Sequence, residues 1–258
     1  MGAGVRRSRE DALCAASALR DISPQVTRTL IIGDVHGCLH ELDELLDRAA
    51  ITSSDRIVFV GDVIGRGPNS VGVLNRILSL GAISIQGNHE RHLLELVDGD
   101  QANGEFARPA AARWSFAQLL EAHHFAMLRA MPLYLDLPLH GACVVHAGVL
   151  HGLDLAAQDP WVLTHMRSLD SLGRPSSELG DRSWAAEYPG PVHVVFGHSA
   201  QRGLQLHSHA TGLDSGCVYG GRLTGLLLEA GEPVPRLAER GRAIVGVAVH
   251  TVHCLPKS

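Results

Sequence analysis

Residues 29–38 read TLIIGDVHGC, a short apolar run that ends at Gly-Asp. Residues 57–67, IVFVGDVIGRG, and residues 82–90, AISIQGNHE, repeat the arrangement. A segment of helical periodicity follows each run, and these helices are expected at residues 39–50, 70–80 and 91–96. Short apolar runs that alternate with helices indicate βαβ units and a parallel sheet. Because ligands of open α/β sheets bind at the carboxyl ends of the strands, the three polar clusters should meet along one edge.

The second half of the chain has a different pattern. After an expected helical stretch at 109–130, apolar runs separated by turn residues predict mainly antiparallel strands. These strands are expected at residues 133–137, 141–146, 192–196 and 223–228. Two of the runs end in histidine-bearing turns, His146-Ala147-Gly148 and Gly197-His198-Ser199.

The domain organisation follows from the lack of a Pro-, Gly- or Ser-rich boundary inside residues 29–230, which are predicted to form one domain. Residues 1–28 are predicted to be a polar N-terminal extension with a short helix at 11–19. Residues 231–258 are predicted to be a C-terminal tail. Its apolar segment AIVGVAV could add an edge strand or cover the core.

The composition is that of a globular protein: 258 residues, 45% hydrophobic and 19% charged, enough for one large or two small domains. A net charge of -5 gives no support to a role based on nucleic-acid backbone contacts, although it leaves room for a local basic cleft. Five scattered cysteines without a CxxC pair argue against a zinc ribbon or a disulfide scaffold. With no secretory signal and no membrane-length apolar run, a soluble, cytoplasmic protein is expected.

The polar clusters have the chemistry of a metal centre. Asp34 and His36 lie two residues apart and could share one cation, while Asp62 could bridge to a second. The second site would be completed by Asn88, His146 and His198. Mixed nitrogen and oxygen ligands favour manganese, iron or zinc over magnesium or calcium; manganese is the ion expected in vitro, and cobalt is a further alternative. Two such cations can ionise a bridging water and hold phosphoryl oxygens in line.

Two further residues fit the same chemistry. His89 follows the expected ligand Asn88 and is placed to protonate a departing oxygen as general acid. Arg66 lies between Gly65 and Gly67 and can fork onto phosphate oxygens, and the flanking glycines let the backbone approach a substrate closely. Trp114, Trp161 and Trp184 are interpreted as packing residues, although a tryptophan on the cleft rim could stack on adenine.

The blocks GDVHG, GDVIGRG, GNHE, HAG and GH resemble the signature of the calcineurin-like metallophosphoesterases, specifically the phosphoprotein phosphatase branch, over residues 29–230. The resemblance implies an α/β (α+β) fold, a central β-sandwich of mixed sheets flanked by helices, with a dinuclear site at the carboxyl ends of the strands. It implies one metal held by Asp34, His36 and Asp62, and a second held by Asp62, Asn88, His146 and His198. It also implies His89 as acid, Asp62 as a catalytic bridging residue, and Arg66, Asn88 and, by a looser match, Arg167 as phosphate-binding residues.

The substrate class is suggested by one departure from the pattern. Serine/threonine phosphatases usually have an Asp before the arginine of the second block, where this chain has Gly65. The block GDVIGRGPNS, and GLDSGCVYGGRLTGLLL at 212–228, instead resemble diadenosine tetraphosphatases and ApaH-like phosphatases. The expected activity is therefore hydrolysis of dinucleoside polyphosphates by attack of a metal-bridging hydroxide on phosphorus. The alternatives are a phosphoserine, phosphothreonine or phosphotyrosine phosphatase, an RNA 5′-cap hydrolase, and an inactive binding scaffold; the oligomeric state is not readable from the sequence.

Overall fold

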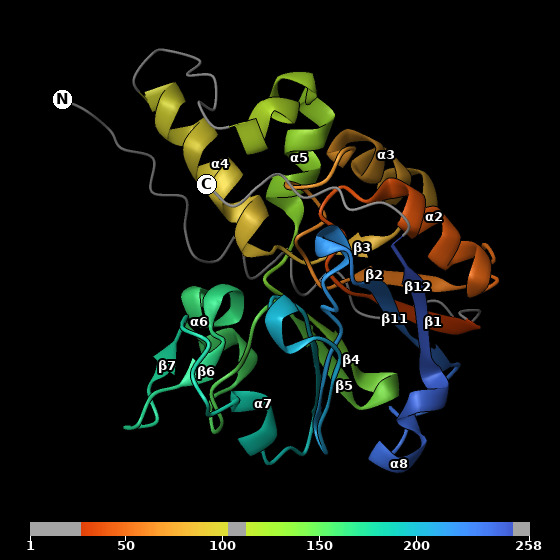
Figure 1. Cartoon of the computed structure of the whole chain (residues 1–258), viewed down its shortest axis with the longest axis vertical. Coiled ribbons are helices and arrows are strands. Elements are labelled where there is room, and N and C mark those ends of the chain that lie inside the picture. The colour runs from red at the N-terminus through yellow and green to blue at the C-terminus, as the bar shows by residue number, and fades with distance from the viewer. Residues whose placement is uncertain (1–26, 103–111, 250–258) are drawn as a thin grey trace.

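The protein is described by a computed structural model that covers residues 27–102 and 112–249 (Figure 1). Two five-stranded sheets form its centre. The first sheet has the order β12 (Ile244–Ala248), β11 (Arg222–Glu229), β1 (Arg28–Ile32), β2 (Arg56–Phe59) and β3 (Ile83–Ser84). The second has the order β4 (Tyr134–Leu137), β5 (Ala142–Val145), β8 (His193–Phe196), β10 (Ala210–Gly212) and β9 (Gln205–Leu206). A two-stranded sheet pairs β6 (Ser168–Leu169) with β7 (Pro175–Ser176).

Helices flank the two sheets (Figure 1). The α-helices are α2 (Leu39–Arg48), α3 (Ser70–Leu80), α4 (Asn88–Ala102), α5 (Ala122–Ala130), α6 (Pro160–His165), α7 (Trp184–Glu187) and α8 (Leu237–Arg240). The 3-10 helices are η1 (Ala112–Leu119), η2 (Pro138–His140), η3 (Leu155–Ala157), η4 (Ala200–Arg202), η5 (Cys217–Tyr219) and η6 (Gly241–Ala243). None of the helices in these parts of the chain is long and apolar enough to cross a membrane.

The alternation of side chains along the strands builds the layers. On β1, Leu30 and Ile32 face one core with side chains of α2 and α3, whereas Ile31 between them faces the second sheet. On β8, Val195 packs against the first sheet while Val194 and Phe196 pack with the α6 and α7 side. Successive residues of a strand point to opposite faces, so strands this apolar are covered on both sides. The predicted sandwich of mixed sheets flanked by helices is therefore confirmed.

The expected helices agree with the structure to different degrees. Helix α3 has the expected bounds because the Asn69 side chain accepts a hydrogen bond from the backbone N–H of Gly72, and Gly81 ends the helix in the left-handed region. Helix α4 is longer than expected and begins at Asn88 itself, so GNHE forms its first turn. The stretch expected to be one helix at 109–130 divides into η1 and α5, and its first three residues lie outside the described part.

The expectation of mainly antiparallel strands in the second half is wrong for the strands that carry the histidines. β5 pairs with β8 in parallel, and β8 pairs with β10 in parallel, whereas β4 and β9 are antiparallel to their neighbours. The connection from β5 to β8 is a long crossover that contains α6, β6, β7 and α7, which is what a parallel pair requires. As a consequence, the carboxyl ends of both strands lie at the same edge.

Both ends of the chain bear on the predicted domain limits. Within the tail, Ile244–Ala248 forms β12, an edge strand paired antiparallel to β11, so this segment extends the first sheet. The helix predicted at 11–19 lies outside the described residues. The division into residues 1–28, 29–230 and 231–258 stays a prediction.

Candidate metal centre and phosphate site

The sequence-predicted ligands gather where five strands end. Asp34 follows β1, Asp62 follows β2, Asn88 follows β3, His146 follows β5 and His198 follows β8. These five strands run in parallel within their sheets, which brings the loops to one edge.

Backbone strain is concentrated at this edge. Among the described residues, five non-glycine residues have positive φ, and four of them are the predicted site residues His36, Asp62, Arg66 and His198. Such conformations cost of order 1–3 kcal/mol each and persist where the surrounding structure enforces them, often at functional sites. The loops are therefore shaped to present these four side chains.

Asp62 is the centre of the cluster and is almost completely buried. Its Oδ2 atom lies 3.6 Å from Nε2 of His36 and 3.9 Å from Nε2 of His89, and its Oδ1 atom lies 3.5 Å from Nε2 of His146. Two groups of donor atoms, each within 4.8 Å of one another, share this carboxylate. One contains His36, Asp62 and His89, and the other contains Asp62, His146 and His198. A carboxylate between two donor groups has the position of a bridging ligand.

Backbone carbonyls fix the orientation of three imidazoles. Nδ1 of His36 lies 3.2 Å from the carbonyl oxygen of Ile64, and Nδ1 of His146 lies 2.8 Å from that of Val60. A carbonyl oxygen can only accept, so each Nδ1 carries its hydrogen, and Nε2 of the neutral ring keeps a lone pair aimed at Asp62. His198 is turned the other way: its Nε2 donates to the carbonyl oxygen of His165 at 3.2 Å, which leaves Nδ1 for the cluster.

Acceptor atoms converge without a donor between them. Nε2 of His146 lies 3.1 Å from Oδ1 of Asn88 and 3.5 Å from Oδ1 of Asp62. Three lone-pair-bearing atoms so close together repel one another unless a cation lies among them. The donor set present in the structure thus fits a resident metal.

The pKa values of the buried carboxyl groups also indicate a site for cations. Burial, together with Asp214 and Asp62, raises the pKa of Asp34 well above its usual value. Burial also raises the pKa of Asp214 to about 7. Burial alone would raise the pKa of Asp62 too, but the surrounding imidazoles of His146, His89 and His36 hold it below its usual range. Buried carboxylates need compensating positive charge, which divalent cations supply.

Asp34 lies on the His198 side of the cluster. Its two carboxylate oxygens accept hydrogen bonds from the backbone N–H of His198 at 3.2 and 3.1 Å. It lines the central cavity but belongs to neither compact donor group, whereas His89 belongs to one. The structure therefore brings both residues to the site and leaves their division into ligand and acid as a prediction.

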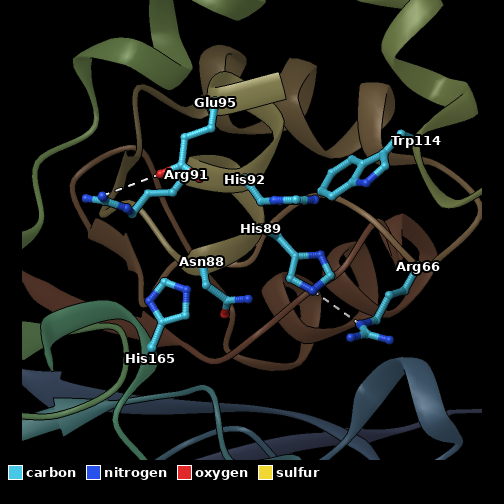
Figure 2. Close-up of a pocket in the computed structure, with 8 residues that line it drawn as sticks. All are labelled: Arg66, Asn88, His89, Arg91, His92, Glu95, Trp114 and His165. Carbon is cyan, nitrogen blue, oxygen red and sulfur yellow. Dashed lines mark hydrogen bonds and ion pairs between the residues drawn. The ribbon is translucent and has the colours of Figure 1, made fainter. Parts of the chain in front are cut away.

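Arg66 and His89 are in direct contact. Nε of Arg66 donates to Nε2 of His89 at 3.3 Å (Figure 2). The guanidinium also lies 5.6 Å from the ring centre of Tyr219. The opposite nitrogen, Nδ1 of His89, is buried and has no hydrogen-bond partner within the described chain. A Cβ atom at Gly65 would lie 2.6 Å from this Nδ1, and φ at Gly65 is +84°. Any side chain at position 65 would therefore clash with the imidazole of His89.

The cluster opens into a cavity of about 80 Å³. Its lining comprises Asp34, His36, Asp62, Arg66, Asn88, His89, Arg167, His198, Ala200, Gln201, Asp214 and Tyr219. Arg167, the looser match, lies in the lining of the same cavity as Arg66, and its phosphate-binding role stays a prediction. Burial lowers the pKa of Arg167, and the carboxylates of Asp62 and Asp214 oppose that shift.

A second cavity has a volume of about 220 Å³. Figure 2 shows the side chains that line it. Arg66, Asn88 and His89 line both cavities, and Arg91, His92, Glu95, Trp114 and His165 line only the larger one. Trp114 is buried, with its ring 5.8 Å from that of His89. Trp184 is buried in the core, as interpreted, whereas Trp161 is 39% exposed and stacks on His165.

Comparison with known proteins identifies the family. The family model of the calcineurin-like phosphoesterases matches residues 27–202. The chain belongs to this family. It is 30% identical over 227 residues to the asymmetrical bis(5′-nucleosyl)-tetraphosphatase PrpE of Oceanobacillus iheyensis, covering 75% of this chain and 86% of that protein. The corresponding protein of Bacillus mycoides is 29% identical over 218 residues, covering 76% and 88%.

Solved structures agree with this assignment. A crystal structure provisionally described as a diadenosine tetraphosphatase is 33% identical, with a TM-score of 0.74 over 88% of this chain and 96% of that one. A serine/threonine phosphatase from Saccharomyces cerevisiae is 15% identical, with a TM-score of 0.52 over 90% and 82%, and shares the fold. The chain is thus a metal-dependent hydrolase of phosphoric ester or anhydride bonds.

Sequence reasoning missed several residues of the site. Glu90 belongs to the GNHE block but received no role, and Asp214 lies in the segment GLDSG without having been singled out. Arg91 and His165 reach the larger cavity from α4 and α6 and carry no local motif, and Tyr219 lies in the quoted block at 212–228 without having been singled out. Only Glu90 and Asp214 had a signal that could have found them, as acidic residues inside quoted blocks.

Proposed function

We propose that the chain hydrolyses dinucleoside polyphosphates, as a bis(5′-nucleosyl)-tetraphosphatase that cleaves asymmetrically into a nucleoside triphosphate and a nucleoside monophosphate. The observation that carries the reaction class is the convergence of acceptor atoms on Asp62. The names of the relatives in Oceanobacillus iheyensis and Bacillus mycoides support the substrate class. The absence of a side chain at Gly65, where the serine/threonine phosphatases have an Asp, supports the same branch.

The proposed roles of the residues follow the sequence prediction. Asp34, His36 and Asp62 would hold one divalent cation, and Asp62, Asn88, His146 and His198 a second. Bound there, the cations supply Lewis acidity that activates water and neutralises charge on the phosphoryl group. Arg66 and Arg167 bind the oxygens of the attacked phosphate from the wall of the small cavity, and Asn88 contributes its amide. His89 donates a proton to the departing oxygen.

The decisive experiment offers three substrates to the purified protein with manganese: diadenosine tetraphosphate, capped RNA and a phosphopeptide. We expect AMP and ATP from the dinucleotide, identified by chromatography, at a kcat/KM at least tenfold above that of either rival substrate. The Asp62→Asn variant serves as the inactive control. Turnover of the phosphopeptide with intact dinucleotide would make the chain a protein phosphatase. ADP as sole product would mean symmetrical cleavage, and preferred turnover of the capped RNA would make the chain a decapping enzyme.

We further propose manganese as the activating ion in vitro and a cytoplasmic location. Nitrogen and oxygen ligands in one set support manganese, with iron, zinc and cobalt as the competing ions. Elemental analysis of the protein purified without added metal, followed by reactivation of the metal-free protein with each ion, tests the choice. Fractionation of cells that express the full chain tests the location.

A further inference from the structure

The larger cavity beside His89 has no role in the site described so far. It shares Arg66, Asn88 and His89 with the small cavity, so the two adjoin at these side chains. Its volume is about 220 Å³ against about 80 Å³. The small cavity has room for one phosphoryl group beside the ligands, and the remainder of a polyphosphate chain must continue elsewhere.

The charge of the larger cavity favours an anionic occupant. Among the described residues that line it, Arg66 and Arg91 are arginines and Glu95 is the only one with a carboxylate. Nη2 of Arg91 lies 3.6 Å from Oε1 of Glu95, a loose, half-exposed contact one helical turn apart. Such surface pairs are worth little, so the guanidinium can turn to a stronger anionic partner. His165 and His92 add imidazole nitrogens to the same wall.

The small cavity differs in the residues that it does not share. Apart from Arg167, the metal-site side chains and Asp214, it is bordered by Ala200, Gln201 and Tyr219, none of which is charged at neutral pH. A nucleoside attached to the attacked phosphate would find neutral contacts there. A chain of further phosphates would find no additional cationic side chain among these three residues.

His89 sets the direction of departure. As the proposed proton donor it must face the leaving oxygen, and it lines both cavities. Because the nucleophile and the leaving oxygen are in line across phosphorus, the leaving group lies on the His89 side. Since His89 lines both cavities, volume decides between them, and the departing polyphosphate is assigned to the larger one, which Arg66 and Arg91 line.

We propose that this cavity, with Arg91 as a substrate-binding residue, holds the phosphates of the departing nucleotide, so that water attacks the α-phosphorus and a nucleoside triphosphate leaves. The inference rests on the proposed function. A water oxygen forms the new bond to the α-phosphorus, and its protons pass to solvent. The bond from the α-phosphorus to the bridging oxygen breaks, and that oxygen keeps the electron pair. It takes the proton that Nε2 of His89 carries once Arg66 has turned from this nitrogen to the phosphate. The products are a nucleoside monophosphate that carries the solvent oxygen and an unlabelled nucleoside triphosphate.

Isotope labelling tests the direction of attack. Hydrolysis of diadenosine tetraphosphate in water enriched in oxygen-18, with products separated by mass spectrometry, should place the label in AMP. Label in ATP would mean attack on the β-phosphorus with AMP departing, and ADP products would mean a different register; either overturns the inference while leaving phosphohydrolase activity intact. Absence of dinucleotide hydrolysis would overturn the proposed function and this inference with it.

Substitution of Arg91 tests the cavity. In Arg91→Ala, kcat/KM for diadenosine tetraphosphate should fall at least tenfold further than kcat/KM for bis(p-nitrophenyl) phosphate, which has no polyphosphate chain. The matched control is Arg129→Ala, since Arg129 pairs with Asp98 at 2.7 Å and lines neither cavity. The control should keep both activities. Equal losses on the two substrates in Arg91→Ala would mean that Arg91 supports the structure of the site and does not bind the polyphosphate.

Product binding gives a second readout that does not require turnover. In calorimetric titrations of the metal-loaded protein, Arg91→Ala should weaken ATP binding about tenfold more than AMP binding. Glu95→Gln should tighten ATP binding because it removes the carboxylate that competes for Arg91. Parallel changes for ATP and AMP would overturn the assignment of the cavity to the triphosphate.

Discussion

At the scale of single residues, the position of His89 depends on what Gly65 lacks. A Cβ atom at position 65 would lie 2.6 Å from Nδ1 of His89, and φ there is +84°. We expect Gly65→Ala to push the imidazole away from Arg66 and to lower kcat for the preferred substrate at least tenfold. Steady-state kinetics together with metal analysis check this, because the ligands lie on other residues and the metal content should persist.

Gly81→Ala is the matched control for this change. Gly81 also has positive φ, at +59°, yet a Cβ atom there would meet nothing within 4 Å. The control should lose about 1 kcal/mol of stability from its strained backbone and keep its activity. If both variants lost activity to the same extent, strain would be the cause and contact with His89 would not.

Either His89 or Asp34 could act as a metal ligand beside His36 and Asp62. His89 lies in the donor group with His36 and Asp62, which would suit a ligand, although it is predicted to be the acid. We expect His89→Asn to lower kcat at least 100-fold, since a positioned general acid contributes about 10²–10⁴-fold, and to leave both metals bound. Elemental analysis decides between the roles. Loss of one metal equivalent in His89→Asn, as expected for Asp62→Asn, would make His89 a ligand.

At the scale of elements, Glu90 joins the start of α4 to the loop after β2. Its carboxylate is completely buried and accepts four backbone hydrogen bonds, from the N–H groups of Asp62, Val63, Ile64 and Gly87. These contacts hold the bridging carboxylate of Asp62 in its strained conformation. In the metal-loaded protein, where the carboxylate is ionised, we expect Glu90→Gln to lower the free energy of unfolding by about 1.5–3 kcal/mol, the range for hydrogen bonds to a charged group. It should also raise the metal concentration needed for half-maximal activity.

The control for this variant is Glu44→Gln on α2. Glu44 makes a solvent-exposed ion pair with Arg48 one turn away, a type of contact worth about 0.3–0.5 kcal/mol. Urea denaturation of the three proteins compares the free energies. An unchanged metal requirement in Glu90→Gln would show that the loop after β2 keeps its shape without this carboxylate.

Among the elements, helix bounds could be predicted from the sequence, whereas strand orientation could not. Helix α3 was predicted at its observed bounds because Asn69 and Gly81 are local signals that act on their neighbours in the chain. The orientation of β5 and β8 was predicted wrongly because it depends on the route of the crossover between them, which leaves no local signal. The residues predicted as ligands nevertheless meet at one edge, since each lies shortly after an apolar run that forms a strand.

At the scale of the whole molecule, the lining of the larger cavity could not be predicted from the sequence. Arg91, Trp114 and His165 come from α4, η1 and the end of α6, and only packing of these elements brings them together (Figure 2). No spacing in the sequence encodes that meeting. Substrate subsites built from several elements are therefore less predictable than ligands placed at strand ends.

The buried acids of the site give the molecule a distinctive pH dependence when metal is removed. Burial raises the pKa of Asp214 from 3.8 to about 7 and that of Glu90 from 4.5 to about 8. The folded state then keeps protons that the unfolded state has already lost, so these groups lower the free energy of unfolding as pH rises toward 8. Burial lowers the pKa of His89 and His193 from 6.5 to about 3, which has the opposite effect, but mainly below pH 6.5.

Between pH 6.5 and 8 the unfolded histidines lose their remaining protons, so their contribution fades and that of the carboxyl groups comes to dominate the slope. We expect the Tm of protein treated with a chelator to fall across this window. The free energy of unfolding should decrease by up to about 1.4 kcal/mol per pH unit for each proton that the folded state retains. With manganese bound the slope should diminish, because a cation keeps the carboxylates ionised in the folded state. Thermal unfolding followed by circular dichroism measures both series, and Asp214→Asn should flatten the chelator series in part. A Tm that rises from pH 6.5 to 8 in chelator would show that the acids of the site are already compensated without metal.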